Sequence, residues 1–350
     1  TMQQLYAMPG YVRDGATDWA TISAPNITSG RNAILPHEYL LYNYLDEAPS
    51  AYRGITLDDL AARNNVQQMK DRWYRNAALT NHTLSLSGKG ERYGAYASLA
   101  YTGQQDATPG NQNRLYQLNA RQDYQLHKQV GVYLITNVLY QEQSAKRAIA
   151  PDSRFVPYAL FEDANGQSLD HSWLYWSDAL RQSYETQSEG LADIDRLNLM
   201  YNPADQFDTG YTRSTLLNSR ILSGIQADLW KGLRFEGVYG VDLANTQERS
   251  YDAASGFDGQ VEIGKMTVAA PSVQSSVPTT GGTLRQTNVQ QRNWTIRNQF
   301  SYSRDWSGGT HQLNALAGLE YQRQTQSAMT NRLRGYDENL LTYKPIDYNT

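Results

Sequence analysis

Short and long connections alternate along this chain, and that alternation limits its fold more than any other feature. From residue 81 onward, apolar and polar side chains alternate in the manner of strands with two unlike faces. The short connections are 88–92, 127–129, 230–232 and 305–311, and the longer ones between them are 104–113, 144–212 and 250–287. Alternate turns of an up-and-down sheet lie at one end, so tight turns gather at one rim and large loops at the other. A soluble sandwich follows no such rule.

The predicted strands are long, at about 10–16 residues against roughly 5–6 in soluble sheets. Only about 9–11 tilted residues are needed to cross the hydrocarbon layer of a membrane. The expected apolar faces are Tyr93, Ala95, Ala97, Leu99 and Tyr101; Tyr116, Leu118, Ala120 and Tyr124; Leu217, Ile221, Ile225, Ala227 and Leu229; Leu233, Phe235, Tyr239, Val241 and Leu243; Trp294, Ile296, Phe300 and Tyr302; and Leu313, Ala315, Ala317, Leu319 and Tyr321. Gln122 interrupts the second of these faces.

The aromatic content favours an interface between oil and water. The chain holds 26 Tyr and 7 Trp, whose rings are apolar and whose tips are polar. They gather near strand ends, as in the two aromatic girdles of membrane barrels, although aromatics are also enriched in ordinary strands. The girdle candidates are Tyr93, Tyr101, Tyr116, Tyr140, Trp230, Trp294, Tyr302, Trp306 and Tyr321. No run approaches the roughly 20 apolar residues of a spanning helix.

The charged residues of the strands are expected to face the lumen of a barrel. A charge on the lipid face costs about 2–4 kcal/mol at the bilayer midplane. The lumen-facing candidates are Arg121, Asp123, Arg220, Asp228, Arg234, Glu236, Arg297 and Glu320. Each could equally form a salt bridge to a plug or occupy a hydrated wall position.

The first 80 residues read differently from the rest. Helical spacing occurs at 37–46 and 57–78, and prolines and glycines break the remainder. We therefore predict an irregular, partly helical extracellular loop region at 1–80 and a β-barrel region at 81–350. The opening residues, TMQQLYAMPGYV, lack the features of a secretory signal, so the chain is either cytosolic or a piece of a longer one.

The long loop 144–212 is the best candidate for substrate contact. It combines aromatic rings with hydrogen-bonding side chains, a mixture suited to glycan or peptide capture. The ligand-binding candidates are Trp173, Tyr175, Trp176, Tyr184 and His171, beside Asp163, Asn165 and Asp170. The loop could instead pack a small core of its own or contact a lid protein. A calcium loop at 163–166 is disfavoured because Leu174 stands where its last glutamate belongs.

Other functional classes find little support. There is no cysteine, and the five histidines show no metal-ligand spacing. No nucleophile elbow, phosphate loop or dinucleotide fingerprint is present. The net charge of −4 does not favour binding to the phosphate backbone of a nucleic acid. We therefore expect no catalytic residue, no metal, no cofactor and no nucleic-acid partner.

The segment from Asp71 to Gln105, DRWYRNAALTNHTLSLSGKGERYGAYASLAYTGQQ, resembles the first barrel hairpin of SusC/RagA-like TonB-dependent transporters of the Bacteroidetes outer membrane. The stretches RLYQLNARQDYQL, LRFEGVYGVD and HQLNALAGLEYQ are similar to later strands of that family, in the same order. The matching positions in the hairpin are Trp73, Arg75, Asn76, Ala77, Asn81, His82, Leu84, Ser85, Ser87, Gly88, Tyr96, Ser98, Leu99, Tyr101 and Gln104.

The resemblance implies part of a 22-stranded antiparallel transmembrane barrel, of which about eight strands are expected here. It implies a nutrient importer in the cell outer membrane, for oligosaccharides or peptides. Its implied partners are outer-membrane lipid, a SusD-like lipoprotein lid and the TonB complex. The family's signal peptide, plug and TonB-contacting segment have no counterpart in the sequence, so we expect a fragment of the barrel's N-terminal part.

Two alternatives stay open at the level of sequence. One is a soluble or surface-exposed β-protein that binds carbohydrate through Tyr- and Trp-rich loops. The other is a passive porin or adhesion barrel without a plug. A soluble β-protein and a barrel differ in where they place five apolar side chains. The soluble protein would bury them in one closed core, and the barrel would leave them in an apolar belt that no protein covers. The five are Leu118, Ile221, Ile225, Phe235 and Leu319.

Overall fold

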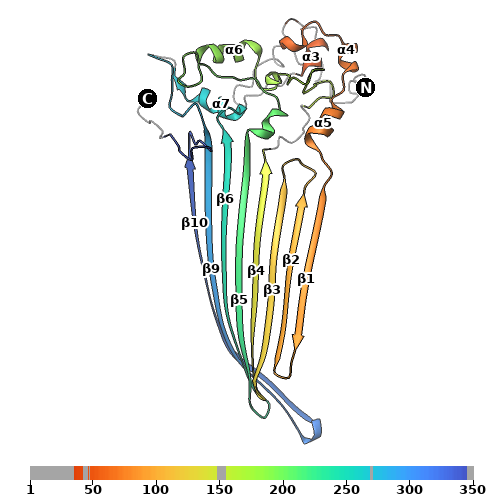
Figure 1. Ribbon diagram of the computed structural model, residues 1–350, viewed down its shortest axis with the longest axis vertical. Coiled ribbons are helices and arrows are strands. Elements are labelled where there is room, and N and C mark those ends of the chain that lie inside the picture. The colour runs from red at the N-terminus through yellow and green to blue at the C-terminus, as the bar shows by residue number, and fades with distance from the viewer. Residues whose placement is uncertain (1–34, 42–45, 47, 148–154, 269–270, 345–350) are drawn as a thin grey trace.

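Eight long antiparallel strands form one open sheet (Figure 1). The computed structural model describes residues 35–41, 46, 48–147, 155–268 and 271–344. The strands pair in the order β1-β2-β3-β4-β5-β6-β9-β10. Their bounds are β1 Ala78–Lys89, β2 Tyr93–Gln105, β3 Gln112–His127, β4 Val130–Lys146, β5 Gly210–Trp230, β6 Leu233–Ala253, β9 Gly282–Trp306 and β10 His311–Leu333. The all-β antiparallel fold predicted from the alternation is confirmed.

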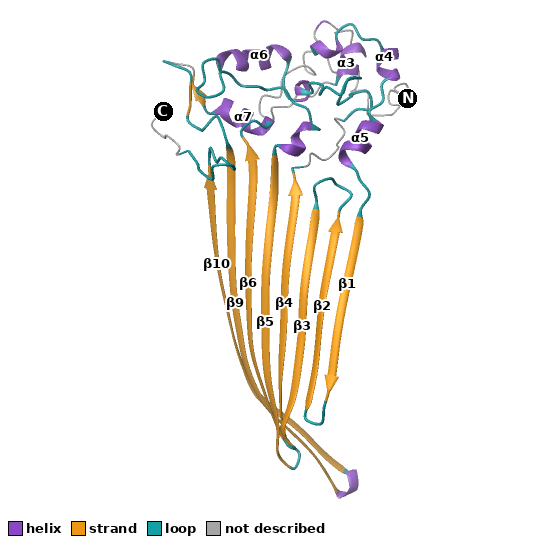
Figure 2. Ribbon diagram, in the orientation of Figure 1, coloured by secondary structure: helices purple, strands orange, loops and turns teal. Residues whose placement is uncertain are grey.

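Tight turns and large loops lie at opposite ends of the sheet. The links 90–92, 128–129, 231–232 and 307–310 lie at the lower end in Figure 1, and the links 106–111, 147–209 and 254–281 lie at the upper end. These are called the turn end and the loop end below. Gly232, with a φ of 81°, occupies the left-handed conformation that the tight β5–β6 turn requires. Helices gather at the loop end, apart from the short η5 (Ser307–Gly309) at the turn end (Figure 2).

Strand pairing places the predicted apolar positions on one face of the sheet. Residues directly opposite each other in neighbouring strands share a face. Leu99 pairs with Leu118, which pairs with Val138, and the same register continues through β5 and β6 to β9 and β10. The apolar rows predicted from period-two alternation therefore belong to the same surface, which we call the apolar face. The exception is Leu229, which has no partner at the β-bulge between Asp228 and Trp230. The opposite surface is called the polar face.

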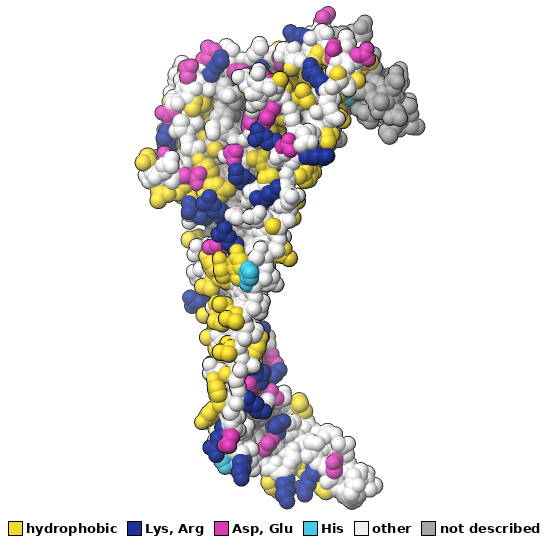
Figure 3. Space-filling model, turned by 45° about the vertical axis from the view of Figure 1, so that its right-hand side comes forward, with side chains coloured by type: hydrophobic (Ala, Val, Ile, Leu, Met, Phe, Trp, Pro, Cys, Tyr) yellow, Lys and Arg dark blue, Asp and Glu magenta, His cyan; other side chains and the backbone are white. Residues whose placement is uncertain are grey.

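The apolar face has no protein cover. Leu118, Ile221 and Leu319 are exposed, and Ile225 and Phe235 are half-buried. None of these five belongs to a buried cluster of the described residues. Figure 3 shows hydrophobic side chains along the middle of the strands, with Lys and Arg toward both ends. The closed core that a soluble β-protein would need from these positions is absent from the described part of the sheet.

The buried core of the molecule lies instead in the loop cap, which we define as the described residues of 35–74, 155–209 and 254–281. One cluster joins Tyr52 and Leu60 to Trp173, and another joins Trp73 to Phe161. The cap contains α3 Pro36–Leu41, η2 Ser50–Tyr52, α4 Leu57–Ala62, α5 Val66–Trp73, η3 Ser172–Leu174, α6 Asp178–Gln187, η4 Asp205–Asp208, α7 Phe257–Lys265, β7 Thr267–Val268 and β8 Gln274–Ser275.

The helical stretch expected at 57–78 divides into α4 and α5, and β1 begins at Ala78. Asn65 ends the run because its buried side chain donates to the carbonyls of Val156 (3.0 Å) and Ala159 (2.9 Å). Those bonds tie the inter-helix turn to the long β4–β5 loop, a constraint that propensity does not contain. Of the stretch expected at 37–46, α3 covers the first part, and residues 42–45 lie outside the described chain.

Candidate functional site

All eight predicted lumen-facing residues lie on the polar face. Strand pairing sets Arg220 opposite Asp242, Asp228 opposite Arg234, and Arg297 opposite Glu320. The same registers join the remaining members, Arg121, Asp123 and Glu236, to this surface. That the polar face lines a lumen stays a prediction.

Hydrogen bonds within and between strands link side chains of the polar face. Asn137 donates to Asn119 (2.8 Å), and Gln299 donates to Glu236 (3.0 Å). Arg121 makes two bonds to Asp123, each 2.8 Å, and Arg234 lies 3.1 Å from Asp228. These charges are half exposed and paired, so they suit a hydrated wall more than a specific ligand contact.

A hollow of about 270 Å³ lies midway along the strands. Its polar-face lining includes Arg220, Asp242, Asn293, Gln322 and Gln324. Asp242 accepts a bond from Asn218 at 3.2 Å, and no carboxylate among the described residues lies within ion-pair distance of Arg220. A cation beside amide side chains can bind hydroxyl, carbonyl or carboxylate groups of a passing solute.

The two faces differ in crowding. Along β3, Arg114, Tyr116 and Leu118 of the apolar face are exposed, whereas Leu115 and Gln117 between them are half-buried. Side chains converge on a concave surface and splay on a convex one. The polar face is therefore the concave side of the sheet.

The loop residues predicted to bind ligand occupy unequal positions. His171 and Trp173 are buried, and the Trp173 ring meets Tyr52 edge to face. Tyr175 and Trp176 are half-buried against the same cluster, and Tyr184 on α6 is exposed. Burial lowers the pKa of His171 and keeps its ring neutral. Of the five, Tyr184 is thus the one already open to solvent.

Asp163 shapes its loop through backbone bonds. Its carboxylate accepts the N–H groups of Asn165 and Gln167, both at 2.8 Å. Those bonds lower the pKa of the Asp163 carboxyl, and the bond from the Gln167 N–H has the largest effect. No group of three metal-binding side chains occurs among the described residues.

Two rows of aromatic side chains border the apolar face. Toward the loop end, Tyr116 pairs with Tyr140. Toward the turn end, Tyr124 of β3 pairs with Tyr93. Tyr116 and Tyr124 are eight positions apart, about 27 Å at about 3.4 Å per residue. The apolar band of a membrane barrel is about 25 Å tall.

Between β3 and β9 both rows shift toward the turn end by the same amount, whereas Tyr101, Tyr116 and Tyr140 lie level on β2–β4. When the pairing is followed from strand to strand, Tyr116 on β3 lies level with Gln290 on β9, which is four positions before Trp294. In the same way, Tyr124 lies level with Asn298, again four positions before Tyr302. A drop of about 14 Å over four strand spacings, about 19 Å, corresponds to a tilt of about 35°. Strands of membrane barrels tilt by about 35–45°.

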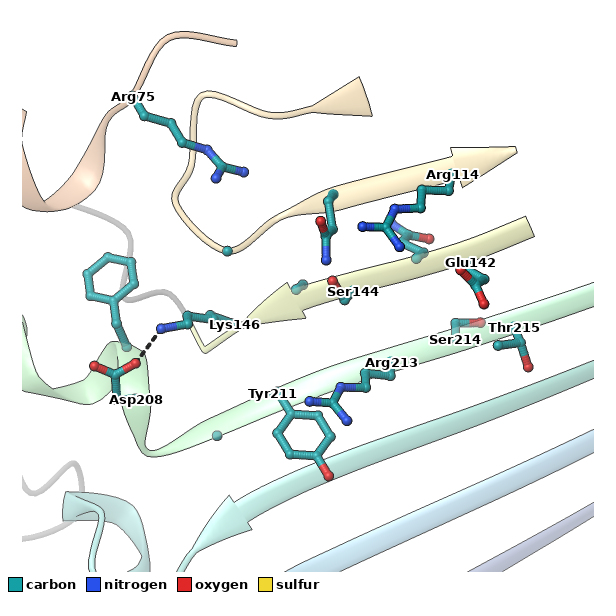
Figure 4. Close-up of a pocket in the computed structure, with 16 residues that line it drawn as sticks. Arg75, Arg114, Glu142, Ser144, Lys146, Asp208, Tyr211, Arg213, Ser214 and Thr215 are labelled. Carbon is teal, nitrogen blue, oxygen red and sulfur yellow. Dashed lines mark hydrogen bonds and ion pairs between the residues drawn. The ribbon is translucent and has the colours of Figure 1, made fainter. Parts of the chain in front are cut away.

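A second pocket, of about 580 Å³, opens at the loop end and had not been expected from the sequence (Figure 4). We call it the rim pocket. Its lining includes Arg75, Arg114, Glu142, Lys146, Asp208, Tyr211 and Arg213. One signal could have indicated it, because Arg114 and Glu142 each stand two positions from an aromatic of the loop-end row and share its face.

The fold matches solved structures of the RagAB peptide importer. The match to the open-open state has a TM-score of 0.56 and covers 80% of this chain. The match to the closed-closed state has a TM-score of 0.58 and covers 87% of this chain. A further structure of the RagAB peptide transporter has 0.59 and 90%. Sequence identity is 16% in each case.

This chain spans 28–31% of the length of the RagAB chains it matches. No protein-family profile and no curated protein matches it. The predicted likeness to SusC/RagA-like transporters is thus confirmed at the level of the fold. No helix in the described part of the chain has the length and apolar character to cross a membrane.

Proposed function

We propose that this chain forms part of the wall of an outer-membrane, TonB-dependent nutrient importer of the SusC/RagA type. The observation that carries the proposal is the sloping apolar band. Its two aromatic borders are eight positions apart on β3 and again on β9. Both borders lie four positions nearer the turn end on β9 than on β3. A flat membrane crossed by tilted strands produces this pattern, and a band made by β-propensity alone has no reason to slope.

The polar face would line the lumen of the importer. Paired charges such as Arg121 with Asp123 would keep the wall hydrated, and the hollow beside Arg220 would offer hydrogen bonds to a passing solute. Binding must stay weak enough to release the solute, which suits scattered polar groups better than a deep site. Oligosaccharides and peptides both fit this chemistry.

The loop cap would lie outside the cell and meet a SusD-like lipoprotein lid. RagAB, whose fold the chain shares, is a peptide importer. The exposed Tyr184 on α6 is the loop aromatic best placed to touch a substrate or a lid. Buried Trp173 and His171, with half-buried Tyr175 and Trp176, would hold the loop in shape for that contact.

The test compares neighbouring positions on opposite faces. This chain has no cysteine of its own, so a single cysteine at Leu118 or Gln117, in a full-length protein cleared of every other cysteine, can be labelled selectively with a small fluorophore. In bilayers containing nitroxide-labelled lipid, the label at position 118 should be quenched strongly and the label at position 117 weakly. Equal quenching at the two positions would overturn the membrane-wall proposal.

Transport itself needs a separate measurement. Uptake of labelled peptides and oligosaccharides by cells carrying the full-length protein should stop when the proton-motive force is collapsed. Uptake that continues would favour a passive pore over a TonB-dependent importer. Selective loss of uptake in Tyr184→Ala, with Tyr74→Ala as an exposed cap control, would place Tyr184 on the substrate path.

A further inference from the structure

Charge is distributed unevenly between the two faces of the sheet. In the eight strands, all of whose residues the structure describes, Glu142 is the one carboxylate on the apolar face, and the other carboxylates lie on the polar face. The apolar face nevertheless carries arginines near its loop end. They are Arg114, Arg213, Arg249, Arg292 and Arg323. A lumen-facing explanation does not apply to them, because they share the face of Leu118 and Ile221.

Three of these arginines follow the aromatic border, whereas Arg213 and Arg249 lie nearer the loop end. Arg114 stands two positions beyond Tyr116 on the same face, and Arg292 stands two positions beyond Trp294. Arg323 has the same relation to Tyr321 on β10. Arg114, Arg292 and Arg323 therefore slope together with the aromatic row, on its loop-end side. In a membrane this is the depth of the lipid headgroups, just outside the aromatic belt.

At β3–β5, Arg114 and Arg213, the latter nearer the loop end, both line the rim pocket. The guanidinium of Arg213 lies over the ring of Tyr211, 4.3 Å from its centre, and Arg114 lines the same pocket (Figure 4). No carboxylate among the described residues lies within ion-pair distance of either arginine. Glu142 accepts the Tyr140 hydroxyl at 2.8 Å instead. The guanidinium groups of Arg114 and Arg213 thus have no ion-pair partner in the described part of the chain, although Glu142 stands opposite Arg114 and lines the same pocket.

The walls of the pocket are held in place by side-chain bonds to backbone carbonyls and by an ion pair. Arg75 donates to the carbonyls of Asp106 (2.9 Å) and Asn111 (2.6 Å), which fixes the β2–β3 loop over the strand ends. Gly110 lets that loop approach closely, because a Cβ there would overlap the side chain of Lys146. Lys146 itself pairs with Asp208 of the cap. A preformed site of this kind loses little entropy when it binds.

We propose that the rim pocket binds a phosphate group of an anionic glycolipid in the membrane leaflet at the loop end. Arg114 and Arg213 supply the fork-shaped donors that suit phosphate oxygens. Tyr211 and the adjoining aromatic row contact the sugar and upper chain region. The pocket volume of about 580 Å³ suits a headgroup. The inference rests on the proposed membrane-wall function, because it requires the apolar face to meet lipid.

The test uses the purified full-length protein in detergent, with lipid A bisphosphate as probe and dephosphorylated lipid A as its partner probe. Retained lipid is counted by native mass spectrometry, and folding is checked by circular dichroism. The wild type should prefer the phosphorylated probe. The double variant Arg114→Gln/Arg213→Gln should lose at least about tenfold in affinity for it, since two charge-assisted bonds are removed.

The matched control is Arg304→Gln. Arg304 lies on the same face at the turn end and should leave loop-end binding unchanged. Equal binding of both probes, or an unchanged double variant, would overturn the proposal. Displacement of lipid A by millimolar inorganic phosphate would also overturn it, in favour of a free-anion site. Nitroxide quenching at position 118 is independent of these charges, so a failure of the pocket with intact quenching leaves the membrane-wall function standing.

Discussion

The loop cap and the strand sheet are stabilised in opposite ways. In the cap, Phe161 and Leu60 are each 1% exposed, and aromatic rings meet around them as in a soluble domain. In the sheet, the large apolar side chains point away from the protein, and Leu319 is 76% exposed. Backbone pairing holds the strands together, while the apolar face is left for another solvent. The same residue types are therefore buried in one region and exposed in the other, where the proposed function gives them lipid to contact.

The largest expected effect is in the cap. Trp73 is 3% exposed and touches Phe155, Phe161 and Phe207, so Trp73→Ala should cost about 3–5 kcal/mol of cap stability. Hydrogen exchange should rise in the cap and stay slow in the sheet. The neighbouring, exposed Tyr74→Ala serves as control. An equal rise in both regions would show that the cap and the sheet unfold as one unit.

A charge on the apolar face should be the next largest perturbation. Ala120 lies midway between Tyr116 and Tyr124, so Ala120→Lys should cost about 2–4 kcal/mol in bilayers. Gln117→Lys on the polar face should cost far less. Refolding equilibria of the full-length protein in lipid vesicles measure both. Similar costs would contradict the assignment of the two faces.

Acid should loosen the cap through His37. Burial lowers the pKa of His37 to about 4, and its Nδ1 lies 2.7 Å from the Tyr158 hydroxyl. Because the folded state holds the neutral ring, its stabilisation is present above pH 6.5 and is lost as pH falls toward 4, by up to about 3 kcal/mol.

Thermal melting of the cap, followed by tryptophan fluorescence, checks this between pH 7 and about 4. His37→Gln should flatten the pH dependence, apart from a share due to His171, whose pKa is lowered in the same direction. An equally steep profile in that variant would remove His37 from the explanation.

The smallest effect should come from a helix cap. Thr56 accepts the N–H of Asp59, and the Asp59 side chain accepts the N–H of Thr56. Thr56→Ala should cost about 1 kcal/mol, confined to α4, and Thr56→Ser should restore most of it. Exchange rates of the α4 amides measure the change. A loss that spreads to the sheet would contradict the separation of the two regions.

The strands and their faces could be predicted because their signal is local. Leu118 and Gln117 differ in character, and neighbours along a strand point to opposite faces whatever the rest of the fold does. The cap could not be predicted in this way. Trp173 and Tyr184 look alike in sequence as ligand-binding aromatics, yet Trp173 packs against Tyr52, more than 100 positions away in the chain, and Tyr184 stays exposed.

The sequence by itself determined the strands, the rims that hold tight turns and large loops, and the separation of apolar from polar faces, because period-two alternation and turn length act between neighbours. Only the tertiary structure decided the slope of the aromatic rows, the rim pocket and the burial of the loop aromatics. Each depends on register or contact between segments distant in the chain: Arg114 and Arg213 share a pocket because β3, β4 and β5 pair as they do.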